Sequence, residues 1–128
     1  MTEKINIEYV QETGFRERME KVSETYLKKY RRRGRFTSYD GTRIFYVTYI
    51  RKNAKGNIVI SHGFSEFAEK YDEMIYYFLQ AGYSVFLAEH RGHGRSERRL
   101  SNMDKVYVES FAQYVRDLHI FVNKIVKP

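Results

Sequence analysis

The stretch NIVISHGFSE, residues 57–66, decides the fold. It begins with three β-branched residues and no polar alternation, which is typical of a strand buried on both faces of a parallel sheet. It turns at Gly63, which permits backbone geometries closed to most residues. Ser65 can cap a following helix, and Glu66 and Glu69 suit the helix dipole in its first turn. We therefore predict a strand, a tight turn and a helix, an arrangement that can aim free backbone N–H groups at a developing negative charge.

A second buried strand is predicted shortly afterwards. The helix is expected over residues 66–80, and Gly82 should stop it. Its apolar residues form one stripe that we interpret as core: Phe67, Tyr71, Met74, Ile75, Phe78 and Leu79. Residues 83–88 (YSVFLA) are again apolar. Two such strands joined by a helix form a βαβ unit, parallel and right-handed.

Upstream of this unit, the sequence predicts a helix and a β-hairpin. Apolar residues at helical spacing indicate an amphipathic helix over residues 15–32: Phe15, Met19, Val22, Tyr26 and Tyr30. The dipeptide Asp40-Gly41 between two β-rich runs indicates a hairpin with a type I′ turn, joining strands over residues 35–39 and 42–51. Residues 52–56 are expected to form a loop.

The predicted elements end with another helix. Ser110 to Gln113 reads as a capping box, and an apolar stripe continues from it: Phe111, Tyr114, Val115, Leu118, Phe121, Val122 and Ile125. The fold class is therefore α/β, a β-hairpin followed by a parallel βαβ unit and flanked by helices. We divide the chain into an N-terminal arm with an amphipathic helix (residues 1–34) and an α/β domain (residues 35–128).

Composition excludes several classes of protein. Among 128 residues there is no Cys, so there is no disulfide framework, thiolate metal site or cysteine nucleophile. The aromatic content of 16% indicates a globular chain. The polar start MTEKINIEYVQET does not resemble a signal peptide, and no apolar run is long enough to cross a bilayer. We expect a cytoplasmic protein, with peripheral membrane contact left open.

The chain is basic, with a net charge of +7 and a pI near 9.6. Much of the excess lies in one basic tract: Lys28, Lys29, Arg31, Arg32, Arg33 and Arg35. A solvated helix end accounts for such a tract, because cations suit the C-terminal end of the dipole. The alternative is a patch for phosphate at an anionic membrane surface or on nucleic acid. No recognised nucleic-acid module accompanies the tract, so the first interpretation is favoured and no nucleic acid partner is expected.

Both parallel strands end in polar loops, which should lie side by side where ligands bind in open α/β sheets. A metal site is one hypothesis, with the candidate ligands His62, Glu89, His90 and His93, although their spacing matches no metal motif. A phosphate cradle at Gly92-His93-Gly94 is a second, weakened by the lack of a third glycine. A third is nucleophilic catalysis with a nearby histidine, for which the candidates are Ser61, Ser65 and Ser96. None of these serines lies in a G-x-S-x-G nucleophile elbow, so caps and turns explain them better.

The fourth hypothesis is an oxyanion hole at the turn His62-Gly63-Phe64. The pair HGFSE (residues 62–66) and HRGHGRS (residues 90–96) resembles the α/β-hydrolase superfamily, and within it the lysophospholipase and monoacylglycerol-lipase-like (serine aminopeptidase-type) group. The resemblance covers about residues 36–126. It implies that the N–H of Phe64 donates to the oxyanion. It further implies a site-supporting role for the surrounding loop residues: His62, Gly63, Arg91, Gly92, His93 and Gly94. In that family an Asp usually stands where this chain has Glu89.

The resemblance also implies which catalytic residues a complete member of the family contains. The family's nucleophile in G-x-S-x-G and its catalytic Asp and His have no counterpart in these 128 residues. We therefore expect the N-terminal part of a serine ester hydrolase acting on lysophospholipids or monoacylglycerols, without cofactor or metal and inactive alone. A half-enzyme completed by a second chain, and a non-catalytic basic module on anionic surfaces, stay open. In the family's strand order the strand at residues 83–88 lies between the hairpin and the strand at residues 58–61. The latter would then be an unpaired edge, which predicts self-association.

Overall fold

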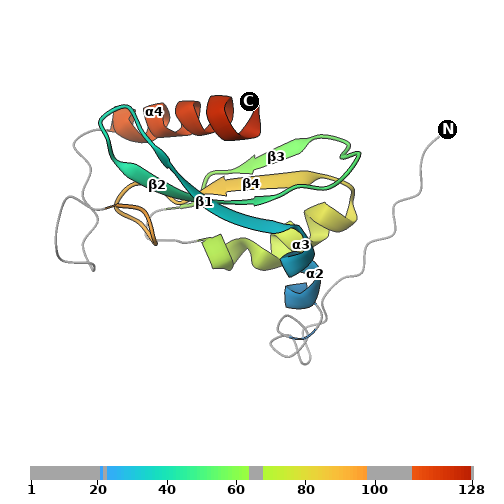
Figure 1. Cartoon of the computed structure of the whole chain (residues 1–128). Helices are drawn as coiled ribbons and strands as arrows, with labels where there is room; N and C mark the ends of the chain where they lie inside the picture. Colours follow the sequence, from blue (N-terminus) through green and yellow to red (C-terminus); the bar gives the residue numbers. More distant parts are fainter. Residues whose placement is uncertain (1–20, 22, 64–67, 98–110, 128) are drawn as a thin grey trace.

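The computed structural model describes residue 21 and residues 23–63, 68–97 and 111–127. These residues form a four-stranded sheet with helices on both faces, α2 and α3 below it and α4 above it in Figure 1. The strands are β1 (Arg31–Thr37), β2 (Arg43–Tyr49), β3 (Asn57–Ile60) and β4 (Ser84–Ala88). The helical elements are α2 (Glu24–Tyr30), η2 (Ala68–Tyr71), α3 (Asp72–Gln80), α4 (Phe111–Phe121) and η3 (Val122–Val126). In the part of the chain so described, no helix combines the length and apolarity needed to cross a bilayer.

The sheet has the strand order β1-β2-β4-β3. β1 and β2 pair antiparallel, β2 and β4 antiparallel, and β3 and β4 parallel, with Ile58 opposite Val85. The predicted α/β class, the hairpin and the parallel pair are thus confirmed. The expected order, with β4 between the hairpin and β3, is also confirmed. Because β3 and β4 run parallel, the loops that follow them leave the sheet at the same end.

The hairpin turn differs from the predicted type I′ turn. Among the described non-glycine residues only Asn53 has a positive φ, so Asp40 does not. Gly41 has a φ of 88°, the N–H of Gly41 donates to the carbonyl of Ser38, and the N–H of Ser38 donates to the carbonyl of Thr42. This is a three-residue loop in which a type I turn precedes a left-handed glycine. The Asp40 carboxylate is thereby turned toward its own backbone, where it accepts from the N–H of Thr42.

The boundary between the first helix and the first strand was also predicted wrongly. The helix ends at Tyr30 rather than residue 32, and β1 begins at Arg31 rather than residue 35. Arg31 is extended, with φ −69° and ψ 129°, and it pairs with Tyr49 of β2. The cations of the basic tract concealed this strand, because an edge strand can carry charges that a central strand cannot. The tract is therefore split between the last turn of α2 and the edge strand β1.

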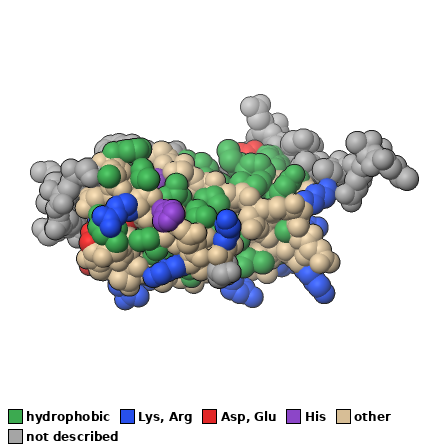
Figure 2. Space-filling view, turned by 90° about the horizontal axis from the view of Figure 1, so that it is seen from above, with side chains coloured by type: hydrophobic (Ala, Val, Ile, Leu, Met, Phe, Trp, Pro, Cys, Tyr) green, Lys and Arg blue, Asp and Glu red, His purple; other side chains and the backbone are tan. Residues whose placement is uncertain are grey.

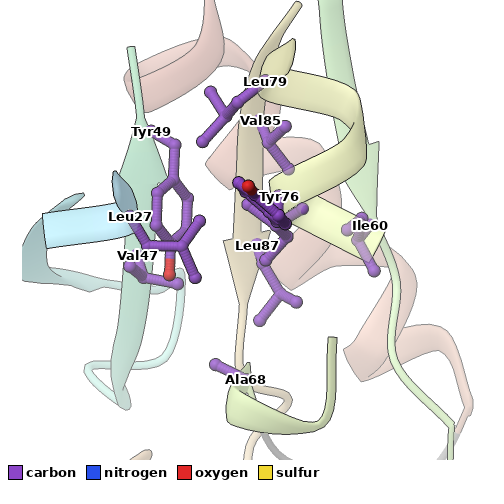
Figure 3. Packing of buried hydrophobic residues seen from close by; sticks show 10 residues of the cluster. Leu27, Val47, Tyr49, Ile60, Ala68, Tyr76, Leu79, Val85 and Leu87 are labelled. Atoms are coloured by element: carbon purple, nitrogen blue, oxygen red, sulfur yellow. The ribbon is translucent and has the colours of Figure 1, made fainter. Parts of the chain in front are cut away.

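The core below the sheet joins α2 and α3 to β2, β3 and β4, as the close view in Figure 3 shows. Leu27 of α2, Leu79 of α3 and Leu87 of β4 are fully buried in it. The α3 stripe was predicted in part: Ile75 and Leu79 are buried, but Met74 is exposed and Tyr76 is buried instead. Helix α3 starts at Asp72 after the 3₁₀ turn η2, later than predicted. The proposed cap Ser65 lies outside the described residues.

The core above the sheet is smaller and is sealed by α4. Phe121 packs on Phe36, with ring centroids 5.9 Å apart, and on the buried Ile44 and Phe86. Of the predicted stripe, Leu118 and Ile125 also pack against this core, whereas Phe111 and Val115 do not. Phe111 and Val115 are 76% and 53% exposed. The other buried residues of α4 are the polar Gln113 and Asp117. Asp117 accepts hydrogen bonds from Ser38 and Arg91.

Strand β3 is less buried than predicted. Its side chains alternate, with Ile58 and Ile60 packed in the core below the sheet and Asn57 and Val59 exposed. Val59 is opposite Phe86 in the register and so faces the α4 side, where it is 36% exposed. The prediction of burial on both faces is therefore wrong for the α4 side. β3 is the last strand of the sheet, and its outer edge has no strand partner among the described residues.

Candidate functional site

The loops after β3 and β4 meet, as predicted, and bring three histidines together. The ring centroids of His62 and His90 are 4.2 Å apart, those of His62 and His93 5.1 Å, and those of His90 and His93 6.1 Å. Tyr114 of α4 closes the group, with its ring centroid 5.1 Å from that of His90. We call this set the histidine cluster: His62, His90, His93 and Tyr114. It lies at the carboxyl end of the parallel pair, the position at which ligands bind in open α/β sheets.

His62 is fixed by hydrogen bonds at both ring nitrogens. The backbone N–H of His90 donates to its Nε2 over 2.8 Å, and its Nδ1 lies 2.7 Å from the carbonyl oxygen of Gly63. Because Nε2 accepts, the proton of the neutral ring belongs on Nδ1, which then donates to Gly63. The imidazole therefore ties the end of β4 to the turn after β3. It acts as a strut between the two loops.

The surroundings of His90 disfavour the charged form of its ring. Burial, together with the positive charge that His62 and His93 would add, lowers the pKa of His90 to about 4. The ring is therefore neutral at pH 7. The hydroxyl of Ser61 lies 3.2 Å from its Nε2. A serine and a neutral imidazole thus stand within hydrogen-bond distance beside the cluster.

The loop after β4 is folded around a buried carboxylate. Glu89 is fully buried, and it accepts from the backbone N–H groups of Ala68 and Arg95 and from the Arg95 guanidinium. Burial raises the pKa of Glu89, but these hydrogen bonds outweigh it and lower the pKa overall. Gly94 has a φ of 51°, and a Cβ there would lie about 2.5 Å from the Glu89 carboxyl. The glycine is required both for the backbone conformation and for this contact.

Arg91 holds the same loop from the other side. It is buried and donates to both oxygens of Asp117 over 2.7 and 2.8 Å and to both oxygens of Asp40 over 2.8 and 3.2 Å. Asp117 also accepts from the hydroxyl of Ser38. Hydrogen bonds from the Arg91 guanidinium hold the pKa of Asp40 well below its usual range. One guanidinium thus joins the hairpin turn, the loop after β4 and helix α4.

A cavity of about 340 Å³ opens beside the histidine cluster. Its lining combines imidazole and hydroxyl groups with the outer face of α4: Ser61, His62, His90, His93, Phe111, Tyr114, Val115 and Leu118. Figure 2 views the molecule from the α4 side and shows hydrophobic side chains gathered on this face, with histidine and basic side chains between them. The exposed stripe of α4 therefore forms an apolar wall opposite the polar loop ends. Such a wall suits an apolar ligand with one polar end.

The structure brings His62, Gly63, Arg91, Gly92, His93 and Gly94 to one end of the sheet, as their predicted supporting position requires. The predicted oxyanion donor Phe64 lies outside the described residues, as does Ser65. Ser96 is not available as a nucleophile, because its hydroxyl donates to the carbonyl of Glu89 and accepts from the N–H of Phe45. The favoured interpretation of Ser96 as a turn-forming residue agrees with these contacts.

The phosphate and metal hypotheses gain no support from these loops. The N–H groups of Gly92 and His93 donate within the loop, to the carbonyls of Glu97 and His90, and the Glu89 carboxylate lies against Gly94. An anion would meet that negative charge instead of free donors. Glu89, proposed as a metal ligand, is committed to Arg95. Within the part of the chain that the structure describes, no group of three or more His, Cys, Asp or Glu side chains could hold a metal ion.

Sequence reasoning missed two carboxylates of the site, Asp40 and Asp117. Asp40 was interpreted only as a turn residue, and Asp117 interrupts an apolar helix without any local signal. Both are recognisable only once Arg91 is known to be buried, because a buried guanidinium requires carboxylate partners. They are 51 and 26 residues from Arg91 in the sequence.

The sheet order, the helices on both faces and the loops that meet after β3 and β4 define part of an α/β-hydrolase fold. Residues 52–128 match the family described as "Serine aminopeptidase, S33", and the chain belongs to that family. The chain is 33% identical over 93 residues to "Lysophospholipase L2" of Escherichia coli K12, covering 73% of this chain and 27% of that protein. It is 30% identical over 89 residues to "Monoacylglycerol lipase" of Mycolicibacterium smegmatis, covering 69% and 30%.

A solved structure gives the same result for the fold. A thermostable carboxyl esterase from Bacillus coagulans superposes with a TM-score of 0.61 at 29% identity, covering 77% of this chain and 32% of the esterase. The chain spans about a quarter to a third of the length of the relatives it matches. The predicted resemblance to lysophospholipases and monoacylglycerol lipases is confirmed.

Proposed function

We propose that these 128 residues supply the oxyanion side of a serine ester hydrolase whose substrates are lysophospholipids or monoacylglycerols. The observation that carries the proposal is the meeting of the His62-Gly63 turn with the loop after β4, beside a cavity with one apolar wall. In this proposal the N–H of Phe64 donates to the oxyanion, and the His62 strut and the Arg91 contacts position the turn. The similarity to a lysophospholipase and a monoacylglycerol lipase supports a lipid ester as the substrate.

We further propose that the 128-residue chain alone does not turn over esters. Its sequence contains no G-x-S-x-G, the context in which a strained strand-to-helix turn exposes a nucleophile. Ser61 and His90 form a serine–histidine contact, but in the described residues no carboxylate is hydrogen-bonded to His90 to orient it. Ser61 also lacks the positive φ of a strained elbow. A nucleophile needs a base that is itself oriented, so this contact lacks one required part.

The test compares the 128-residue chain with a chimera in which a segment of a relative carrying G-x-S-x-G, Asp and His follows residue 128. A serine-reactive fluorophosphonate should label the chimera and not the shorter chain, and only the chimera should hydrolyse lysophospholipid or monoacylglycerol. Replacing the serine of the added segment by alanine is the control and should abolish both signals. Labelling of the shorter chain that is lost in Ser61→Ala would show instead that Ser61 is itself a nucleophile. A chimera active only on non-lipid esters would contradict the substrate class.

A half-enzyme completed by a second polypeptide is the second candidate. It is favoured by the unpaired outer edge of β3, with Val59 exposed on the α4 side, together with the exposed Phe111 and Val115 of α4. A strand could add to that edge through backbone hydrogen bonds while its apolar side chains cover α4. Mixing the 128-residue chain with the separately produced segment should then restore labelling in trans. Restoration only in the covalent chimera would contradict this candidate.

A further inference from the structure

The basic tract forms a hollow where α2 meets β1. The hollow has a volume of about 380 Å³ and is lined by Glu24, Lys28, Arg31, Arg32 and Arg33. It is formed by the last turn of a helix and the first residues of the edge strand, so it lies at the margin of the sheet, away from β3. Arg32 and Arg33 follow one another on a strand and so point to opposite faces of the sheet. The hollow therefore wraps around the edge of β1.

The cations that line the hollow differ in what neutralises them. Arg31 is committed: its guanidinium donates to both oxygens of Glu24, lies 3.9 Å from Asp72, and donates to the hydroxyl of Tyr49. The same pairing neutralises Glu24, the one acidic residue of the lining. By contrast, Lys28, Arg32 and Arg33 are exposed, and none of them forms an ion pair with a carboxylate in the described part of the chain. Three cations without a carboxylate partner in the described residues thus lie beside the neutralised Arg31–Glu24 pair; the Arg32 guanidinium donates to the carbonyl of Arg31.

Solvation alone would not require this arrangement. Charges on an edge strand prevent sheet-to-sheet pairing, and isolated cations on its two faces are sufficient for that purpose. Here the cations line one hollow at the edge of β1, where the Arg31–Glu24 pair joins α2 to the strand. The exposed Lys29 and Arg35 lie next to the hollow in the sequence and extend the positive surface. A concave surface with several cations and little negative charge attracts phosphate groups.

We propose that this hollow and its neighbours bind the phosphate groups of an anionic phospholipid bilayer. The choice of a bilayer rests on the proposed lipid ester substrate, which is delivered from a lipid surface. The lining contains no aromatic side chain on which a base could stack, as single-stranded nucleic acid sites require. Binding at this margin would hold the chain at the surface through five exposed cations: Lys28, Lys29, Arg32, Arg33 and Arg35.

The experiment is co-sedimentation of the full 128-residue chain with vesicles of phosphatidylcholine alone or with 30 mol% phosphatidylglycerol. Binding should require the anionic lipid and should weaken with rising salt, since surface charges are screened. Each cation near an anionic surface contributes about fivefold in partition. The variant R32Q/R33Q should therefore lose about 25-fold, and K28Q about fivefold. The matched control K124Q/K127Q removes the same net charge from exposed positions on and just after η3 and should change binding less than twofold.

Further variants and competitors test whether net charge or nucleic acid accounts for binding. R32K/R33K keeps the charge and should bind like the wild type. If R32Q/R33Q proves unstable by thermal unfolding, the K28Q and R32K/R33K results decide the question. Equal losses in R32Q/R33Q and K124Q/K127Q would show that only net charge matters and would overturn the proposal. Binding to a 20-nucleotide DNA without binding to vesicles would overturn it in favour of nucleic acid. Inorganic phosphate that displaces no vesicle-bound protein even at 100 mM would also contradict it.

The readouts separate this proposal from the proposed function. In the chimera described above, R32Q/R33Q should leave hydrolysis of a water-soluble short-chain ester unchanged and should slow hydrolysis of a substrate presented in anionic vesicles. An inactive chimera that still binds vesicles would contradict the proposed function alone. An active chimera with no preference for anionic vesicles would contradict the bilayer proposal alone.

Discussion

The backbone N–H of His90 donates to Nε2 of His62 across 2.8 Å, and this bond joins the ends of two neighbouring parallel strands. It also fixes the tautomer of His62, whose Nδ1–H is left to donate to Gly63. The turn after β3 is therefore positioned by a side chain, not by its backbone alone. Phe64, the proposed oxyanion donor, is the residue that follows Gly63 in the sequence.

Replacing His62 by Phe should destabilise the protein by about 1–3 kcal/mol, because the N–H of His90 would lose its acceptor in a part-buried site. The free energy of unfolding in urea measures the loss. The control is His119→Phe on the exposed side of α4, which should stay within about 0.5 kcal/mol of the wild type. Equal stability of the two variants would show that the strut contributes nothing.

Replacing Arg91 by Met should cost about 3–5 kcal/mol, because Asp117 would be left buried without its charged partner. Arg33→Met removes an exposed arginine that has no ion pair among the described residues, and its effect on stability should be small. A second change, Asp117→Asn in the Arg91→Met background, should recover part of the loss by removing the unpaired charge. Absence of recovery would argue against the electrostatic cause.

Gly94→Ala should destabilise more than Gly41→Ala. Both glycines have positive φ, at 51° and 88°, so both substitutions incur the strain of about 1–2 kcal/mol that an L side chain meets there. At Gly41 nothing lies within 4 Å of the new Cβ, whereas at Gly94 the Glu89 carboxyl is about 2.5 Å away. The difference between the two unfolding free energies therefore measures the crowding against Glu89. Equal values would show that the loop relaxes without loss.

The stability of the protein should depend on pH through the protonation of His90. Its pKa is about 4 in the folded protein against 6.5 for the free side chain, so between these values the unfolded chain binds more protons. The contribution of His90 therefore rises with pH from 4 to 6.5 and is lost as the pH falls through this window. Asp72 acts in the opposite sense from about pH 3.8 to 6, because burial raises its pKa to about 6.

The measurement of this effect uses Asp72→Asn as the background, which removes the opposing slope. Urea unfolding at several pH values between 4 and 7 should give a steeper rise for Asp72→Asn than for Asp72→Asn combined with His90→Gln. The slopes should differ by at most about 1.4 kcal/mol per pH unit, the value for one proton. Parallel curves would show that His90 titrates normally in the folded protein.

Self-association through β3 is predicted for the 128-residue chain. The outer edge of β3 has no strand partner in the described residues, and Val59 is exposed on the α4 side of the sheet. Sedimentation velocity should show dimers or larger species that grow with concentration. Val59→Lys should suppress them, because a lysine on an edge strand opposes pairing; Val59→Pro should do the same by disturbing the strand. A monodisperse monomer at high concentration would contradict this prediction.

The sequence predicted the parallel pair and the hairpin better than the start of the basic edge strand β1. The β-branched run at residues 58–60 and the dipeptide Asp40-Gly41 are local signals, so the parallel pair and the hairpin could be recognised directly. The start of β1 could not, because Arg31 and its neighbours resemble a solvated helix end. Only the distant Tyr49 and Glu24, which contact Arg31, show that it is extended and part-buried.

The sequence predicted where the site lies better than it predicted which side chains contact one another there. Two polar loops that follow neighbouring parallel strands must meet, so the sequence alone was enough to predict that the histidines lie together. The burial of Asp117 was not predictable, since an acidic residue in an apolar helical stripe gives no sign of a distant arginine. The exposure of Phe111 and Val115 was missed for the same reason: Arg91 and Ser38 hold Asp117 on the buried side of α4, and these two apolar residues face outward.

The Arg91 contacts have a consequence for protein engineering. The tip of a two-stranded hairpin usually accepts an inserted peptide, since it is exposed and makes few contacts. Here the tip contains Asp40, which accepts from the same Arg91 guanidinium as Asp117 of α4. An insertion at residues 39–41 would therefore disturb the loop that carries Arg91 and the histidines. In the connection between β2 and β3, Arg51 and Lys55 donate to the carbonyls of Leu79 and Gly82, away from the histidine cluster. Lys52 and Asn53 are exposed between them and are the better position for an epitope tag or a fluorophore.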